Sequence, residues 1–327
     1  MKNINWSKYS KPIILVAFIV VLSVLKPAEF LSVSNFISIL TSVAAIGIMV
    51  SGTIFVFLIG GIDLSIATLL SFSAVVAATV TTKMGGSTGA VIVGLIAALI
   101  VGALAGLVHG YITTTFAIPA FLVTFATQSV FLGLAQVLSN NNKIACTWPA
   151  FAILGKAVAP IIFMVLFALV SWYVLRKTVF GRYVYAVGGN PTASEISGIN
   201  VKLVSILCYA ISGFTTAMGG IILAAQSQQA DSALGAGFTN DVITAAVIGG
   251  ISLLGGEGTL PGAIFGAVLM GLLNNGLSLM NVDSTQSGLV KGLVIVVAVA
   301  FDALHHADQS RKKVKKVKKA ASAPELS

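Results

Sequence analysis

Four side-chain amides in strongly apolar surroundings are the residues whose type best suits the binding of a polar solute. An amide donates and accepts hydrogen bonds without carrying a charge, so it can bind a hydroxyl group or join two neighbouring helices. Polar groups within membrane segments are functional candidates by default, and both interpretations stay open for each residue. The predicted substrate-pathway residues are Gln128, Asn274, Asn275 and Gln286.

The sequence offers no arrangement for covalent or metal chemistry. It contains no GxxxxGK[ST] phosphate loop. Its histidines, His109, His305 and His306, lack metal-ligand spacing, because adjacent histidines on a helix point about 100° apart. The two cysteines, Cys146 and Cys208, are expected to be unpaired thiols. We therefore expect no catalytic residue, no metal site and no cofactor on this chain, so ATP-driven work must be powered by another chain.

The elements that hold these amides are predicted to be membrane helices. The 327 residues are 57% hydrophobic and 9% charged, whereas a soluble domain carries about 25% charged residues. Apolar runs longer than about 18 residues recur along the chain. We predict an all-α integral membrane protein with about ten transmembrane helices. The expected spans are 12–31, 36–60, 64–82, 88–110, 119–139, 157–175, 203–225, 241–254, 260–280 and 287–304.

The distribution of basic residues predicts that both termini are cytoplasmic. With ten spans and the N-terminus inside, fourteen of the 19 basic residues fall on the cytoplasmic side. The span 241–254 is short and interrupted by glycine, so the number ten depends on it. Residues 1–306 are predicted to form a single transmembrane domain, and 307–327 a basic, disordered cytoplasmic tail. Because its basic residues directly follow the last predicted span, this tail is expected to anchor the topology and to contact membrane lipid rather than to bind nucleic acid.

One internal cytoplasmic loop, 176–202, contains the signals of a short helix. Asn190 suits the N-cap, Pro191 the first helical position and Gly198 the residue after the helix end. These residues predict an exposed helix over about 191–197. A helix of that length is unstable alone in water, so it needs a docking surface on its own chain or on a partner.

Asp63 lies near the inner end of the second span, where two functions are open to it. Asp is a strong N-cap and favours the positive end of a helix dipole, so it could cap the third span. The alternative is a role in the cytoplasmic gate or in contact with an ATPase. A related stretch at 248–258 repeats the letters IGGI of 59–62, which hints at an internal repeat, and it ends near Glu257.

Small residues at regular spacing predict close helix packing. In lipid the hydrophobic effect does not drive helices together, so close backbone approach supplies much of their association. Gly262 and Gly266 repeat the spacing in the ninth span. The fourth span carries a small residue at every fourth position: Ala90, Gly94, Ala98, Gly102, Gly106 and Gly110.

Two polar, weakly charged segments are predicted on the outer side. They are 139–142, which is rich in asparagine, and 226–231, which is rich in glutamine. Such loops suit the docking of an external protein, and simple solvated turns would look the same.

Several motifs together give the chain a family resemblance. They are GGIDLS at 60–65, GRYVYAVGGN at 181–190, SGIN ending at Asn200, IGGISLLGGEGT at 248–259 and NNGLSLM at 274–280. In this order and spacing the chain resembles the membrane subunit of bacterial ABC importers for ribose and related simple sugars. The resemblance runs over nearly the whole chain except the basic tail, and none of the motifs identifies the sugar.

This resemblance implies an ABC importer permease fold in a multi-pass protein of the bacterial inner membrane. The permease would be non-catalytic and would translocate a ribose-like monosaccharide, or a related small polyol or furanose, into the cytoplasm. Implied partners are a cytoplasmic ABC ATPase that binds ATP and magnesium, a periplasmic or lipid-anchored sugar-binding protein, and a second permease copy in a homodimer. The short helix becomes a coupling helix that docks on the ATPase. The predicted ATPase-coupling residues are Arg182, Asn190, Pro191, Glu195, Gly198, Asp63 and Glu257.

An ion-coupled secondary transporter of a small polar solute is the alternative function. Such a transporter usually carries coupling carboxylates or histidines within its spans. The acidic residues of this sequence are expected at span ends, which favours the ATP-driven importer.

Overall fold

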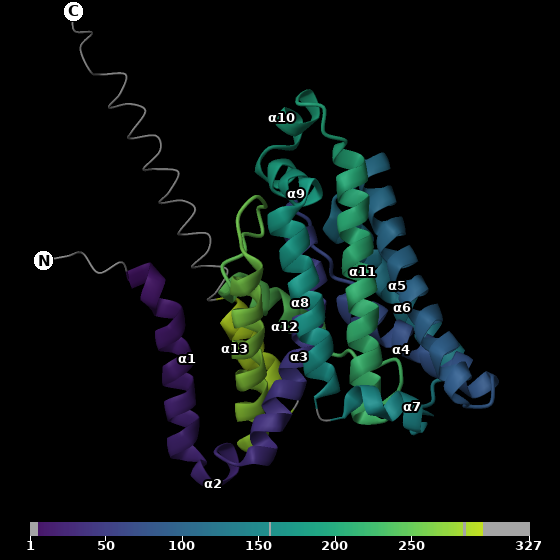
Figure 1. Ribbon diagram of the computed structural model, residues 1–327, viewed down its shortest axis with the longest axis vertical. Coiled ribbons are helices and arrows are strands. Elements are labelled where there is room, and N and C mark those ends of the chain that lie inside the picture. The colour runs from purple at the N-terminus through teal and green to yellow at the C-terminus, as the bar shows by residue number, and fades with distance from the viewer. Residues whose placement is uncertain (1–5, 157, 284–285, 297–327) are drawn as a thin grey trace, which may run out of the picture.

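The computed structural model of the chain is a mostly helical bundle (Figure 1). It describes residues 6–156, 158–283 and 286–296. The predicted basic tail, 307–327, lies outside the described residues, as does the second half of the predicted last span. The helices α9 and α10 lie at one end of the bundle, which we call the α10 end, and α2 and α7 lie at the opposite end.

Seven described helices are long and apolar enough to cross a membrane. Two apolar helices among the described residues are shorter, namely α12, Phe238–Ile248, and the helix Gln286–Val296. The structure therefore agrees with an all-α membrane protein, while the number ten stays a prediction. The seven are α3 Val33–Leu58, α4 Ile66–Lys83, α5 Thr88–Thr115, α6 Ala120–Ser139, α8 Ala159–Lys177, α11 Val201–Ser227 and α13 Leu260–Leu279.

The first predicted span, 12–31, is displaced in the structure. Helix α1 covers Trp6–Leu25, and a separate short helix, α2, covers Pro27–Phe30. Lys26 between them has φ −141° and ψ 60°, outside the helical region. A proline disfavours helical geometry in the residue before it, so Pro27 ends the first helix early.

Helix α3 runs through the middle of the protein, and its C-terminal half is buried. Ile54, Phe57 and Leu58 are fully buried, and they pack in one core with residues of α4, α12 and α13. Helices α6 and α8 instead bury few of their apolar side chains. Exposed apolar helix surfaces of this kind suit contact with lipid.

The predicted close packing at small residues is confirmed. A Cβ at Gly102 would lie 2.5 Å from the carbonyl oxygen of Gly213, and one at Gly106 would overlap the carbonyl oxygen of Tyr209. Helix α5 therefore packs on α11 backbone to backbone. Gly266 meets the carbonyl oxygen of Ala245 in the same way, which packs α13 on α12.

The two IGGI segments end helices in the same way but in a different register. Gly60 has φ +77°, and the N–H of Gly61 donates to Val56 O after α3. Gly250 has φ +84°, and the N–H of Ile251 donates to Ala246 O after α12. Both are Schellman caps. The left-handed residue is the first glycine of one IGGI and the second glycine of the other, so the shared letters do not mark aligned repeats.

Smaller elements complete both ends of the bundle. At the α10 end lie α9, Val179–Gly189, and α10, Pro191–Ile196. At the opposite end lie α7, Pro149–Ala152, and the 3₁₀ turn Ile153–Gly155. Strand β1, Ile144–Ala145, pairs antiparallel with β2, Gln229–Ala230. This pairing joins the predicted outer segment 226–231 to residues that follow the other predicted outer segment, 139–142.

Candidate functional site

Helix α10 has the caps that its sequence predicts. The backbone N–H of Ala193 donates to Asn190 Oδ1 at 2.9 Å, and Pro191 occupies the first turn. Gly198 follows the helix with φ +83°, and its N–H donates to Glu195 O at 2.9 Å. Glycine adopts this left-handed conformation without steric cost. The predicted helix is therefore confirmed, with its last residue at Ile196.

The surface of α10 is open to solvent. Asn190, Pro191 and Glu195 are exposed, and Ile196 is 83% exposed. Figure 1 shows α10 at the tip of the bundle, beyond α9 and the end of α11. An apolar side chain at such a tip is available for a partner.

Arg182 lies on a helix that the sequence analysis did not predict. Helix α9 begins after Thr178, whose Oγ1 accepts a hydrogen bond from the N–H of Gly181 at 3.2 Å. Arg182 is exposed, whereas Val184 and Val187 are buried. The sequence does contain a signal for this helix, because Val184 and Val187 are three residues apart and apolar residues at that spacing indicate an amphipathic helix.

Glu257 lies on a turn-rich loop, 249–259, which packs beside α9. Its side chain is exposed, and its carbonyl oxygen accepts a hydrogen bond from the N–H of Ser252 at 2.9 Å. Tyr185 of α9 donates its hydroxyl to Gly258 O at 2.9 Å. Burial raises the pKa of the Tyr185 phenol, and the charge of Arg176 opposes that rise. Tyr185 therefore stays a neutral hydrogen-bond donor, a role that was not predicted from the sequence.

Asp63 is buried, unlike the other predicted coupling residues. It is 1% exposed, and its Oδ1 accepts hydrogen bonds from the N–H of Ser65 at 2.9 Å and the Oγ of Ser65 at 2.7 Å. Helix α4 begins at Ile66 with Ser65 at the N-cap position. Asp63 thus fixes the turn before α4 rather than occupying the cap itself. In this conformation its carboxylate is closed to direct contact with another protein.

A second buried polar group lies near Asp63. His109 is fully buried, and its Nε2 lies 2.7 Å from Thr127 Oγ1. Its ring stacks edge-on against Tyr209, whose hydroxyl is buried with no partner among the described residues. A histidine and a tyrosine on different predicted spans carry no joint sequence signal, so this contact was missed.

The four predicted pathway amides do not form one site. Asn275 exchanges hydrogen bonds with Asn35 of α3 at 2.6 and 3.2 Å. Of the two predicted functions for this amide, the structure therefore shows the joining of two helices. Gln286 is exposed, and its backbone N–H donates to Asp283 Oδ1 at 2.8 Å. Gln128 is half-buried on α6, which lies on the other side of the bundle from α13 in Figure 1.

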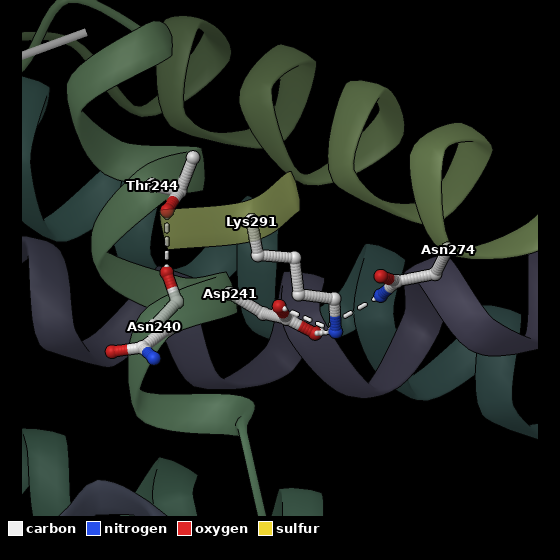
Figure 2. Close-up of polar contacts among 5 residues, drawn as sticks. All are labelled: Asn240, Asp241, Thr244, Asn274 and Lys291. Atoms are coloured by element: carbon white, nitrogen blue, oxygen red, sulfur yellow. Dashed lines mark hydrogen bonds and ion pairs between the residues drawn. The ribbon is translucent and has the colours of Figure 1, made fainter. Parts of the chain in front are cut away.

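Asn274 belongs to a buried charged cluster, which Figure 2 shows. Its Nδ2 donates to Asp241 Oδ2 at 2.9 Å, and its Oδ1 is buried with no partner among the described residues. Lys291 Nζ lies 3.0 Å from Asp241 Oδ1 and 3.1 Å from Oδ2. The side chains of Lys291 and Asp241 are only 18% and 3% exposed. The cluster joins α12, α13 and the helix Gln286–Val296.

The ion pair was not predicted from the sequence. The charge count assigns Lys291 to the outer side, at the start of the predicted span 287–304, and Asp241 is the first residue of the predicted span 241–254. The structure places Asp241 in the first turn of α12, which lies at mid-height of the bundle in Figure 1, and pairs it with Lys291. Both residues fall within predicted spans, and a charge in a membrane segment usually has a partner there. That rule could have found the pair.

Comparison with known proteins identifies the class of this chain. Residues 35–299 match the family described as the permease component of the branched-chain amino acid transport system. The chain belongs to this family of membrane permeases.

Several curated proteins that are similar to this chain are named as sugar permeases. The ribose import permease protein RbsC of Bacillus subtilis is 38% identical over 291 residues, which cover 87% of this chain and 89% of that protein. RbsC of Escherichia coli K12 is 35% identical, covering 91% of this chain and 94% of that protein. The D-allose transport system permease protein AlsC of the same strain is 30% identical, covering 91% and 92%.

Proposed function

We propose that this chain is the membrane permease subunit of an ATP-driven importer for a simple sugar. The observation that carries the proposal is the similarity to sugar import permeases along almost the full length of both chains. The substrate class is a ribose-like monosaccharide or a related small polyol or furanose. The protein is a multi-pass protein of the bacterial inner membrane, and it breaks no bond itself.

The α10 end is the proposed contact with a cytoplasmic ABC ATPase, which would bind ATP and magnesium. The exposed residues Arg182, Asn190, Pro191, Glu195 and Glu257 gather at this end, and Ile196 adds an apolar side chain. Gly198 ends α10, and Asp63 acts indirectly by fixing the start of α4. A docking surface on the ATPase would stabilise α10, which is too short to be stable alone.

The remaining assembly follows from the same proposal. A periplasmic or lipid-anchored sugar-binding protein would dock at the opposite end, where the β1–β2 pairing brings the polar segment 226–231 beside the residues that follow 139–142. Two permease copies would form a homodimer in contact with membrane lipid. Ten spans and cytoplasmic termini complete the arrangement, supported by the excess of basic residues on that side. The proposed permease domain is 1–306.

The translocation path is the least defined part of the proposal. Asn274 remains the best pathway residue, since one of its amide atoms is buried without a partner among the described residues. Gln128 has no interhelical bond among the described residues and stays a pathway prediction. Ligands and nucleotide would shift the conformations only through different affinities for them.

The buried Asp241 is the observation that favours the ion-coupled alternative. A secondary transporter uses intramembrane carboxylates of this kind. Here, however, Lys291 neutralises the carboxylate at 3.0 Å, which leaves no free negative charge for a coupling ion. The ATP-driven importer therefore stays the preferred function.

Co-purification followed by an ATPase assay tests the proposal. We expect a cytoplasmic ATPase to co-purify with the permease, and its activity to rise when the sugar-binding protein and one sugar are added. The panel contains D-ribose, L-arabinose, D-allose and D-fructose, with L-leucine included because the family description names branched-chain amino acids. Stimulation by leucine alone, or a purified permease without any ATPase, would contradict the proposal.

A further inference from the structure

We propose that a glycine junction at the α10 end transmits the motion of α10 to the transmembrane helices. The junction consists of residues 58–60 at the end of α3, Gly188 of α9, and residues 255–256 of the loop before α13. This inference rests on the proposed function, because it assumes that an ATPase moves α10.

The three segments of the junction touch through their backbones. A Cβ at Gly188 would overlap the carbonyl oxygen of Leu58 and lie 2.6 Å from the nitrogen of Gly256. A Cβ at Gly255 would lie 2.8 Å from the nitrogen of Gly60 and 3.0 Å from the carbonyl oxygen of Gly188. No side chain fits between these segments, so none can absorb a displacement by changing its rotamer.

Two hydrogen bonds fix the contact. The N–H of Gly256 donates to Leu58 O at 2.8 Å, which ties the loop to α3. The hydroxyl of Tyr185 donates to Gly258 O at 2.9 Å, which ties α9 to the same loop. Tyr185 is therefore a positioning residue. Tyr183, two residues earlier, is 39% exposed and offers a matched control.

The place of the junction in the chain gives it this mechanical role. Gly188 stands two residues before Asn190, the N-cap of α10. Residues 58–60 lead into the turn fixed by Asp63 and then into α4, and residues 255–256 lead into α13. Closely packed protein has low compressibility and transmits strain. A shift of α10 therefore displaces the ends of α3, α4 and α13 together.

Replacing Gly188 by alanine tests the junction in the intact complex. We compare Gly188→Ala with Gly189→Ala in proteoliposomes that contain the permease, its co-purified ATPase and the sugar-binding protein, and the probe is the radiolabelled panel sugar that wild type imports, with D-ribose tried first. Gly189 is the matched control, because a Cβ there meets nothing within 4 Å. In Gly188→Ala we expect ATP hydrolysis to continue and sugar uptake per ATP to fall about tenfold. Gly189→Ala should keep the wild-type ratio.

A second pair of variants keeps the inference testable if Gly188→Ala fails to assemble. Tyr185→Phe removes one hydrogen bond without adding volume, so we expect uptake per ATP to fall about threefold. Tyr183→Phe should leave it unchanged. A merely structural role would lower uptake and hydrolysis together, at a constant ratio.

The outcomes separate this inference from the proposed function. If wild type imports none of the panel sugars with ATP, the proposed function fails first. If wild type imports sugar and Tyr185→Phe keeps the wild-type ratio, the proposed function stands and the junction is overturned. The junction is also overturned, and the proposed function stands, if wild type imports sugar and Gly188→Ala assembles and keeps the same uptake per ATP as Gly189→Ala.

Discussion

Lys291 and Asp241 stabilise one another inside the helical bundle. A buried charge that has lost its partner costs far more than the pair contributes, because the remaining charge is desolvated without compensation. The pair therefore acts mainly as a specific connection between α12 and the helix Gln286–Val296. It is a different kind of feature from the exposed charges at the α10 end.

Removing one charge of the Asp241–Lys291 pair should lower the free energy of unfolding more than removing both charges. We expect Lys291→Met to lower the free energy of unfolding by about 3 kcal/mol, measured by thermal unfolding in detergent. The double variant Asp241→Asn with Lys291→Met should recover most of the loss. Lys83→Met, at an exposed position at the end of α4, is the control. Equal losses in the single and double variants would show that the pairing does not matter.

Cys146 should be unreactive in the folded protein. Burial raises the pKa of its thiol to about 12, so almost no thiolate, the reactive species, is present at pH 8. With Cys208→Ala as the background, we expect no maleimide labelling until denaturation. Ser197→Cys at the exposed end of α10 provides the positive control.

The same pKa shift predicts how stability depends on pH. In the unfolded chain the thiol ionises near 9.0, whereas the folded protein holds its proton up to about 12. The unfolded state therefore binds fewer protons in this range, and the contribution of Cys146 to stability falls between pH 9.0 and about 12. Rapid labelling of the native protein at pH 8 would contradict both expectations.

At the scale of elements, helix packing depends on where backbones touch. Gly106 of α5 meets the backbone of Tyr209 in α11, whereas Gly133 of α6 has nothing within 4 Å of a built Cβ. Gly106→Ala should therefore lower the melting temperature by several degrees, because the helices must separate. Gly133→Ala should be neutral or slightly stabilising, since alanine favours helix. If both variants melted alike, close packing of α5 on α11 would not be important for stability.

The caps of α10 give a second prediction at this scale. Asn190→Ala removes the side chain that accepts the Ala193 N–H, which costs about 1 kcal/mol of helix stability. We expect faster hydrogen exchange in α10 and reduced sugar uptake. Asn190→Asp keeps the oxygen acceptor and should behave like wild type. Unchanged exchange in Asn190→Ala would show that other contacts hold the helix.

What could be predicted from the sequence was local. Asn190, Pro191 and Gly198 lie within nine residues, and together they predicted α10 before any packing was known. The Asp241–Lys291 pair depends on how helices 50 residues apart meet. Asp63 was predicted either to cap the third span or to act in the cytoplasmic gate or in contact with an ATPase, yet the turn before α4 is buried against neighbouring helices. Contacts of that kind are set by tertiary packing, which a single sequence does not display.

The two ends of the whole molecule differ in the surfaces that they present. The α10 end carries exposed charges on α9, α10 and loop 249–259, while the opposite end carries the β1–β2 pairing. Between them lie apolar helices and the buried Asp241–Lys291 ion pair. This arrangement suits a subunit that receives solute at one end and mechanical work at the other.

The energy source of transport distinguishes an ATP-driven importer from an ion-coupled transporter. The measurement is uptake of radiolabelled sugar from the panel into proteoliposomes that hold the permease, its ATPase and the sugar-binding protein, with and without ATP. We predict that accumulation requires ATP and persists when an ionophore dissipates ion gradients. Uptake that continues without ATP and collapses with the ionophore would contradict the account.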